Sequence, residues 1–211
     1  MPGLAAARRR ATDDGPQLTA FAAPEGRAPG LGAARRRAQL MARNVEVKAR
    51  LPHGLDALLP RARALADGPE QRIHQDDTFF ACAHGRLKLR DFGDGRGELI
   101  AYARADDAGP KLSDYVRAPT SDPAALREAL TRATGVIGRV RKTRWLLLAG
   151  QTRIHLDRVD GLGEFMELEV VLRGDQSVAE AERIAERLLA QFGIDASQRI
   201  AGAYLDLLAQ R

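Results

Sequence analysis

Residues 152–172 read TRIHLDRVDGLGEFMELEVVL, and their order of polar and apolar side chains decides the fold class. In the second half, Glu167 and Glu169 fall on one face, and the residues beside and between them are apolar. In the first half, His155 and Asp157 share a face in the same way. A period of two is typical of β-strands, and the intervening Gly-Leu-Gly indicates a turn. The stretch therefore predicts two consecutive antiparallel strands.

The chain after residue 40 repeats this alternation, interrupted by helical segments. Further strands are predicted at 44–51, 77–82, 86–92, 98–104 and 136–148. Helices are predicted at 55–67, 123–133, 177–192 and about 197–209. The third helix lies between a Ser-x-x-Glu capping box and a closing glycine. Hairpin-connected strands mixed with helices predict an α+β fold, with an antiparallel sheet large enough to close into a barrel.

The first forty residues differ from the rest in composition. They are rich in Ala, Arg, Gly and Pro, and their seven arginines against three acidic side chains carry +4 of the net charge of +5. Such a segment buries too little apolar surface to offset chain entropy. We therefore expect residues 1–40 to be a disordered tail, or the product of a start assigned upstream of Met41. A catalytic domain at 41–211 is expected to work without them.

The compartment and the class of partner follow from the cysteine count and the charge. The single cysteine, Cys82, excludes an internal disulfide framework and a multi-cysteine zinc site. The longest apolar runs, such as 146–149, are far too short to cross a bilayer. We therefore expect a cytoplasmic protein without a membrane partner. A nucleic-acid partner is disfavoured, because the basic excess lies in the tail and no RNP-like or KH-like segment is present.

Several predicted strands carry charges at a period of two. Arg86, Lys88 and Arg90 share a face, and so do Lys142 and Arg144. One explanation is an antiparallel sheet with a solvated face. The other is a closed barrel whose charges line the interior, where an unpaired charge is costly. Many cations with a few carboxylates would then require a polyanion and a divalent metal, and a phosphate chain with Mg²⁺ fits both.

The segments that carry these charges occur in a distinctive order. They are NVEVK (44–48), QDDTFF (75–80), GRLKLR (85–90), LIAYAR (99–104), VRKTR (140–144) and IHLDRVDGLGEFMELE (154–169). Together they resemble the CYTH superfamily, the triphosphate tunnel metalloenzymes, over about residues 44–205. The resemblance implies a closed eight-stranded antiparallel β-barrel, the triphosphate tunnel, with flanking helices. It also implies that acidic side chains bind Mg²⁺ or Mn²⁺ and that basic side chains bind a triphosphate substrate.

The resemblance assigns roles position by position. It implies metal ligands at Glu46, Asp157, Glu167 and Glu169. It implies catalytic cations at Lys48, Lys142 and Arg144, and a triphosphate cradle at Arg86, Lys88, Arg90 and Arg104. The chain departs from the family's usual Glu-x-Glu-x-Lys signature by having Asn44 in the first position. Asn44 offers an oxygen without a negative charge, so whether one metal or two bind stays open.

Three functions remain open at this stage. The resemblance is nearest to the class IV adenylyl cyclases, which implies conversion of ATP to cyclic AMP and pyrophosphate. Within the family, the alternative is an inorganic, thiamine or nucleoside triphosphatase that releases orthophosphate. The alternative of another class is a polyphosphate- or RNA-binding module without turnover. Carboxylates that face the same phosphates disfavour this module unless a cation lies between them. Assembly as a homodimer is also open.

Overall fold

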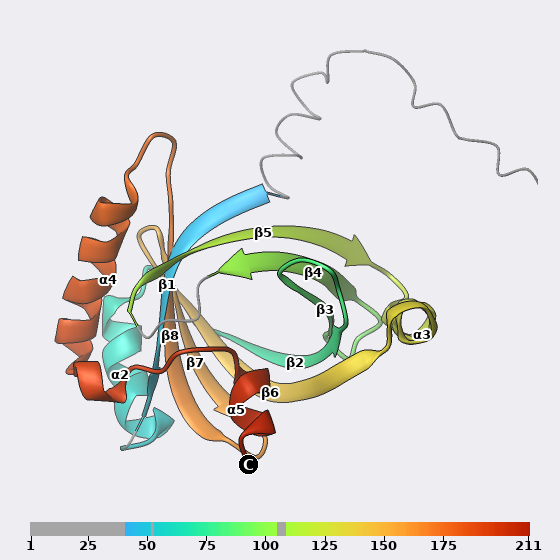
Figure 1. Ribbon diagram of the computed structural model, residues 1–211. Helices are drawn as coiled ribbons and strands as arrows, with labels where there is room; N and C mark the ends of the chain where they lie inside the picture. The colour runs from blue at the N-terminus through green and yellow to red at the C-terminus, as the bar shows by residue number, and fades with distance from the viewer. Residues whose placement is uncertain (1–40, 52, 105–108) are drawn as a thin grey trace, which may run out of the picture.

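The structure, a computed structural model, describes residues 41–51, 53–104 and 109–211. Eight antiparallel strands form a closed ring within these residues (Figure 1). The strands are β1 (Met41–Arg50), β2 (Gln71–Phe80), β3 (Arg86–Asp91), β4 (Gly97–Arg104), β5 (Lys111–Thr120), β6 (Val136–Ala149), β7 (Thr152–Val159) and β8 (Gly163–Val171). Their order around the ring is β1-β5-β4-β3-β2-β6-β7-β8, and β8 pairs with β1 again. The predicted closed eight-stranded barrel is confirmed. The predicted tail, residues 1–40, lies outside the described residues.

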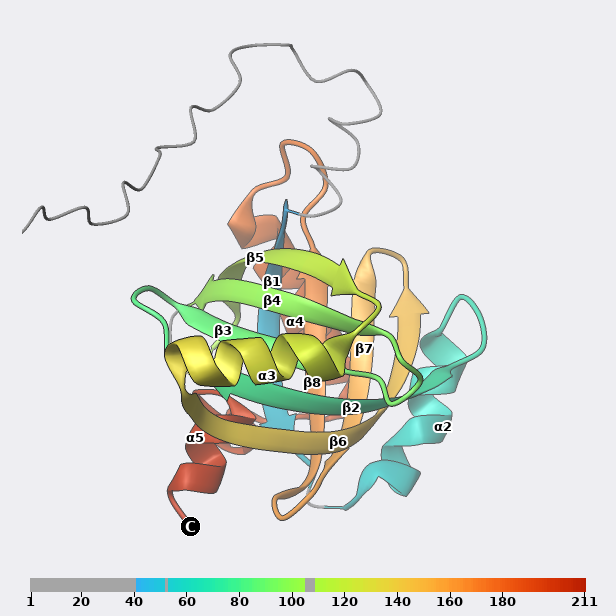
Figure 2. The ribbon, with the colours of Figure 1, turned by 90° about the vertical axis from the view of Figure 1, so that its right-hand side faces the viewer.

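The helices lie outside the ring. They are α2 (Leu55–Leu65), α3 (Pro123–Thr134), α4 (Val178–Phe192) and α5 (Tyr204–Ala209), with a short 3₁₀ turn at Ala196–Gln198. Helices α2 and α4 lie together beside β1, β7 and β8, and α3 lies on the opposite side of the ring (Figure 1). Figure 2 faces α3, which packs against β2 and β3. Among the described residues, no helix combines the length and the apolar character needed to span a membrane.

The main hydrophobic core lies between the barrel wall and the helices α2 and α4. The outward side chains of β1, β7 and β8, among them Val47, Leu156 and Leu168, are buried against apolar residues of both helices. Because successive strand residues point to opposite faces, burying the apolar set outward turns the charged set inward. The barrel interior is therefore polar, which is the reverse of a small barrel filled by apolar side chains.

Local signals place the ends of two helices where the sequence predicts them. At α4, Ser177 and Glu180 form the predicted capping box, and Gly193 ends the helix with a φ of 67°. The positive φ is a conformation that glycine adopts without steric cost. At α3, the Asp122 side chain accepts a hydrogen bond from the Ala125 amide at 2.9 Å. These caps satisfy amides that have no partner within the helix.

Three elements differ from the sequence prediction. Strand β2 begins at Gln71, six residues before the predicted start, because its first half is mostly polar and little buried apart from Gln75, and pairs along β6. Strand β5 was not predicted, because its inward positions are polar. The first half of the predicted helix 197–209 is instead the end of a 3₁₀ turn followed by extended chain. There, Ile200 donates a backbone hydrogen bond to Lys48 at 3.0 Å, and Gly202 has a φ of 75°. The helix α5 therefore starts only at Tyr204.

Candidate functional site

A cavity of about 280 Å³ occupies the barrel interior. Its wall is formed by inward side chains of all eight strands, together with Ala203 and Tyr204 near the start of α5. The charged and amide side chains in this wall are Asn44, Glu46, Lys48, Gln75, Asp77, Lys88, Arg90, Glu98, Arg117, Lys142, Arg144, Arg153, Glu167 and Glu169. Their clustering follows from the outward burial of the apolar residues.

Asp77 on β2 holds two cations of the neighbouring strand β3. Lys88 donates to one carboxylate oxygen at 2.8 Å, and Arg90 donates to both oxygens at 2.8 Å. The three residues meet because Asp77 and Arg90 are direct cross-strand partners. Burial by itself raises the pKa of Asp77, but the charges of Arg90 and Lys88 outweigh it and hold this pKa well below its usual range. The carboxylate is therefore ionised and fully paired.

Asp157 on β7 likewise holds two cations of a neighbouring strand, β6. Arg144 donates to both of its oxygens at 2.6 Å, and Lys142 lies 3.3 Å from one of them. The hydroxyl of Tyr204, at the start of α5, donates to the same oxygen at 3.0 Å. Burial, followed by the repulsion of Arg144, lowers the pKa of Lys142 to about 7. A lysine in this cavity can thus lose and regain its proton near neutral pH.

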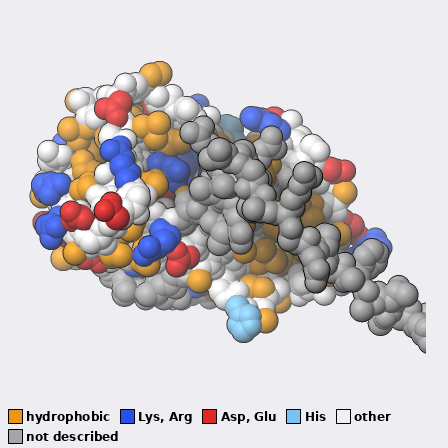
Figure 3. Space-filling model, turned by 90° about the horizontal axis from the view of Figure 1, so that it is seen from above, with side chains coloured by type: hydrophobic (Ala, Val, Ile, Leu, Met, Phe, Trp, Pro, Cys, Tyr) orange, Lys and Arg blue, Asp and Glu red, His pale blue; other side chains and the backbone are white. Residues whose placement is uncertain are grey.

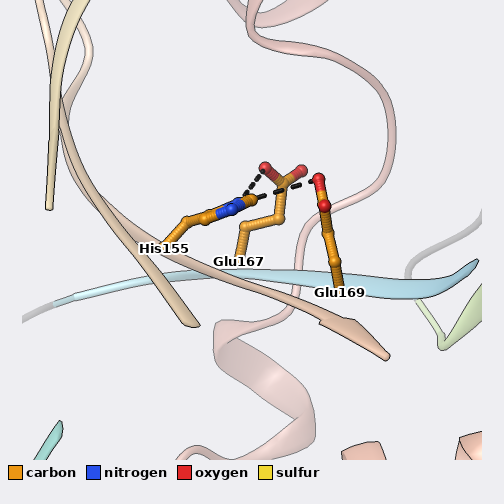
Figure 4. A group of neighbouring side chains, drawn as sticks. All are labelled: His155, Glu167 and Glu169. Carbon is orange, nitrogen blue, oxygen red and sulfur yellow. Dashed lines mark ion pairs between the residues drawn. The ribbon is translucent and has the colours of Figure 1, made fainter. Parts of the chain in front are cut away.

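A third group consists of His155, Glu167 and Glu169, which we call the His155 cluster (Figure 4). One ligand atom from each of its members lies within 4.8 Å of the others. Glu167 also pairs with Lys48 at 3.3 Å and with Arg144 at 2.8 Å. Burial raises the pKa of Glu167, but the charge of Lys48 and the contact with His155 lower it well below its usual range. Both glutamates of this group have pKa values below the ordinary value.

Helix α5 lies at one end of this network. The Tyr204 ring packs on Phe165 with centroids 4.9 Å apart, and the ammonium groups of Lys48 and Lys142 lie 4.1 and 4.9 Å from its centroid. Arg86 pairs with Asp206 of α5 at 2.9 Å. Arg86 thus contacts the helix and is not part of the cavity wall.

Comparison of the sequence with models of protein families identifies a family that fits the closed ring with charged side chains inside. The sequence model of the CYTH domain matches residues 42–204. The chain belongs to the CYTH domain family. Among curated protein sequences, none matches the chain.

Solved structures share the CYTH fold at low sequence identity. A protein from Pyrococcus horikoshii has a TM-score of 0.69 and 20% identity, covering 78% of this chain and 98% of that one. A proposed adenylate cyclase from Vibrio parahaemolyticus has a TM-score of 0.59 and 23% identity, covering 79% of this chain and 97% of that one. A proposed adenylyl cyclase from Hippeastrum, with a dominant triphosphatase activity, has a TM-score of 0.56 and 18% identity. The match covers 76% of this chain and 91% of that one. At these identities the likeness establishes the fold alone.

Most of the predicted site residues of this CYTH domain meet at the cavity. Eight of them line its wall: Glu46, Lys48, Lys88, Arg90, Lys142, Arg144, Glu167 and Glu169. Asp157 lies just behind the wall, fully buried under Arg144. Arg86 lies at α5, as described above. The side chain of Arg104 lies outside the described residues.

Several members of the polar network, among them Asp77 and His155, were not among the predicted site residues. Asp77 lies in a segment that was quoted for the resemblance, and the face that it shares with Gln75 could have drawn attention to it. His155 shares a face with Asp157, two residues away, which was a usable signal. Neither pattern reveals which cation or carboxylate the side chain meets, because the partner lies on another strand.

The donor set of the His155 cluster fits a divalent cation. Two carboxylates supply anionic oxygens, which hard divalent cations prefer. His155 is 3% exposed, and its Nδ1 atom is buried without a hydrogen-bond partner. Glu46 on β1 is the direct cross-strand neighbour of Glu169, so a further carboxylate lies on the adjacent strand. Asp157, by contrast, already has its oxygens occupied by Arg144, Lys142 and Tyr204.

Proposed function

We propose that this CYTH protein is a metal-dependent enzyme that acts on a nucleoside triphosphate, as an adenylyl cyclase that forms cyclic AMP and pyrophosphate. The observation that carries the proposal is the arrangement of charge around one cavity inside the barrel. Cations of β3 and β6 and a carboxylate-rich cluster of β8 face the same space. A phosphate chain with a divalent cation balances both kinds of charge.

In this proposal the cations bind the phosphate chain. Lys88, Arg90 and Lys142 are already oriented by Asp77 and Asp157, so little side-chain freedom is lost when phosphate oxygens arrive. A Mg²⁺ or Mn²⁺ ion held by Glu167 and Glu169 would neutralise phosphate oxygens and act as a Lewis acid. The surrounding barrel limits the access of water and strengthens these electrostatic contacts.

Two amide side chains favour a nucleoside over a bare phosphate chain. Asn44 and Gln75 are buried in the cavity wall, and within the described part of the chain the carbonyl oxygen of each side chain has no hydrogen-bond partner. A buried acceptor without a partner costs free energy, about 1–3 kcal/mol. Ribose hydroxyls or the amino group of a base can donate to such oxygens, and tripolyphosphate has no comparable neutral donor.

The proposed reaction needs a base as well as charge stabilisation. The ribose 3′ oxygen attacks the α-phosphorus, pyrophosphate leaves, and the hydroxyl proton must be taken up. Lys142, whose pKa is lowered to about 7 by burial and Arg144, takes up a proton as the phosphate chain binds and is then a cation, so the hydroxyl proton passes to water. Positioning of the two reacting groups by Arg and Lys contacts supplies most of the remaining rate.

The size of the cavity favours a second candidate, a triphosphatase that releases orthophosphate. At about 280 Å³ the cavity lies just below the usual range of roughly 300–1,000 Å³ for ligand pockets. A phosphate chain alone needs less room than a whole nucleotide. Water would then be the nucleophile.

A binding module without turnover is the candidate of another class. In the part of the upper surface that the structure describes, exposed Lys and Arg side chains lie next to Asp and Glu side chains (Figure 3). This mixture offers a nucleic-acid backbone no continuous cationic track on that face. The binding-module hypothesis therefore holds only if the protein turns over no triphosphate.

Product analysis distinguishes the three candidates. The full chain is incubated with Mn²⁺ or Mg²⁺ and, separately, ATP, thiamine triphosphate and tripolyphosphate, and the products are separated by chromatography. Cyclic AMP and pyrophosphate in equal amounts are expected. ADP and orthophosphate from ATP, or faster turnover of tripolyphosphate, would replace the cyclase with the triphosphatase. Binding of all three without products would overturn both enzymatic candidates.

A further inference from the structure

His155 contacts both glutamates of its cluster, but at distances longer than an ordinary hydrogen bond. Its side chain is buried, and its Nδ1 atom makes no hydrogen bond although two carboxylates face it. Nδ1 lies 3.5 Å from Glu167 and 3.7 Å from Glu169. A ring nitrogen that served only to orient a carboxylate would donate to it at about 2.7–3.2 Å.

The distances instead suit a cation between the three side chains. Bonds from a metal to imidazole nitrogen or carboxylate oxygen are about 2.0–2.2 Å long. Two ligand atoms of one ion therefore lie between about 3 and 4.4 Å apart, depending on the angle between the bonds. The separations of Nδ1 from both carboxylate oxygens fall in this interval.

The strands hold these donors rigidly. His155 on β7 and Glu167 on β8 are direct cross-strand partners, and Glu169 follows two residues later on the same face of β8. Directly opposed residues of an antiparallel pair have Cβ atoms only about 4.5–5.5 Å apart. The ladder thus brings the imidazole beside both carboxylates, and Figure 4 shows the ring pointing toward the ends of the two glutamate side chains.

We propose that His155 is a protein ligand of the metal site through Nδ1, and that it makes the site prefer Mn²⁺ to Mg²⁺. The proposal deepens the proposed function, since the ion is the one that the triphosphate enzyme would use. Mg²⁺ favours oxygen ligands in near-ideal octahedral geometry and keeps several waters. Mn²⁺ also favours oxygen ligands, but as a first-row transition cation it accepts an imidazole nitrogen more readily than Mg²⁺ does.

The neighbouring cations do not obscure this preference. Lys48 and Arg144 both contact Glu167 and oppose the approach of any cation. Arg153 lies 3.2 Å from Glu169 and acts in the same direction. Their repulsion is nearly equal for Mn²⁺ and Mg²⁺, because both ions carry the same charge. The ratio of the two affinities therefore isolates the contribution of the nitrogen donor.

Pulsed electron paramagnetic resonance of Mn²⁺ on the full-length chain tests the ligand directly. The spectrum of the unchanged protein, without substrate, is expected to contain the ¹⁴N coupling of one bound imidazole. Glu169→Gln should weaken the binding of this ion, which places the signal at the cluster. Mn²⁺ bound there without ¹⁴N coupling would overturn the proposal, and so would a failure to bind Mn²⁺ up to millimolar concentration.

A variant tests the selectivity. His155→Asn replaces nitrogen by oxygen, so the ratio of Mn²⁺ to Mg²⁺ affinity, measured by competition, should fall at least about tenfold. His84→Asn is the matched control, because His84 is an exposed histidine between β2 and β3, and it should leave the ratio unchanged. An unchanged ratio in a folded His155→Asn protein would refute the ligand role. The spectrum of the unchanged protein decides the matter if that variant fails to fold.

These measurements are independent of turnover. Mn²⁺ coupling to His155 without any turnover of triphosphates would support the ligand assignment and refute the proposed function. Turnover of ATP with Mg²⁺ and Mn²⁺ bound equally well and without ¹⁴N coupling would do the opposite.

Discussion

The barrel contains two kinds of carboxylate, and the difference between them lies in their partners. Asp77 and Asp157 each hold two cations, with every carboxylate oxygen accepting a charged hydrogen bond. Among the described residues, Glu169 has one ion pair with a basic side chain, Arg153 at 3.2 Å, and it faces an imidazole nitrogen that has no hydrogen-bond partner there. Glu167 is intermediate, since it pairs with Lys48 and Arg144 and also faces His155.

The difference indicates that the aspartates and the glutamates serve separate tasks. A fully paired carboxylate has little capacity left for a metal, but it keeps buried cations from repelling each other before an anion arrives. A carboxylate with few partners beside an unpaired nitrogen retains that capacity. Residue type alone does not separate the two tasks, because both kinds lie on inward strand faces.

The largest effect is expected at the glutamates. Glu167→Gln and Glu169→Gln keep the shape and one oxygen ligand but lose the charge. Each should lower kcat/KM by more than about 100-fold, beyond the upper end for residues that only support a metal ligand. Higher Mn²⁺ is expected to rescue one of them in part. Steady-state kinetics over a range of metal concentrations measures this.

Thermal unfolding separates these two variants. Glu167→Gln should also lower the melting temperature, because it removes a partner from buried Lys48 and Arg144, whereas Glu169→Gln should change it little. The contradicting result would be that both variants lose stability while their folded fraction keeps the turnover rate and the metal dependence of the unchanged protein. This pattern would make both glutamates salt-bridge partners and remove the metal assignment.

The fold could be predicted from the sequence of the strands that face α2 and α4. There the outward residues are buried, so β8 shows a clear period of two. Strand β5 could not be predicted in this way. Its inward residues include Lys111 and Ser113, and its outward residue Val116 is 41% exposed. A strand that is polar inside and uncovered outside has no apolar alternation to detect. The eighth strand was expected only from the family resemblance.

The inward direction of the charges could be predicted, but their partners could not. Period two shows that Lys88 and Arg90 share a face, and it says nothing about Asp77. The pairing depends on β2 lying beside β3, and the pairing of Asp157 with Arg144 depends on β6 lying beside β7. Such neighbours are set by the closure of the ring. The role of His155 remained hidden for the same reason.

A smaller effect, on stability, is expected at Asp77. Asp77→Asn leaves Lys88 and Arg90 buried without their anion, which typically costs about 3–5 kcal/mol of unfolding free energy. Tripolyphosphate should restore much of the loss, because its oxygens replace the carboxylate and binding to the folded state alone stabilises it. Denaturant unfolding with and without tripolyphosphate measures both quantities.

The control for this prediction is Asp94→Asn. Asp94 pairs with Arg96 in the turn between β3 and β4, where both side chains are largely exposed, so its loss should cost little. The shift caused by tripolyphosphate should be larger for Asp77→Asn than for Asp94→Asn or the parent. Equal shifts in all three proteins would mean that phosphate oxygens do not take the place of Asp77.

The smallest effect is a proton taken up on binding, and it distinguishes Lys142 from the fully charged cations around it. Burial and Arg144 lower the folded-state pKa of Lys142 to about 7, and an unfolded lysine has a pKa of about 10.4. Between these values the unfolded chain binds the proton and the folded chain does not. Stability from this group therefore rises with pH from about 7 to about 10.

A bound triphosphate reverses this state of Lys142, because nearby negative charge favours the ammonium form. At pH 8, where the phosphates are already ionised, binding should take up close to one proton per triphosphate. Calorimetry in two buffers of different ionisation enthalpy measures this number, and Lys142→Met should abolish the uptake. If the parent takes up no proton, Lys142 is already charged in the free barrel. The attraction of Asp157, 3.3 Å away, would then outweigh burial, and Lys142 would be a cation both with and without the triphosphate.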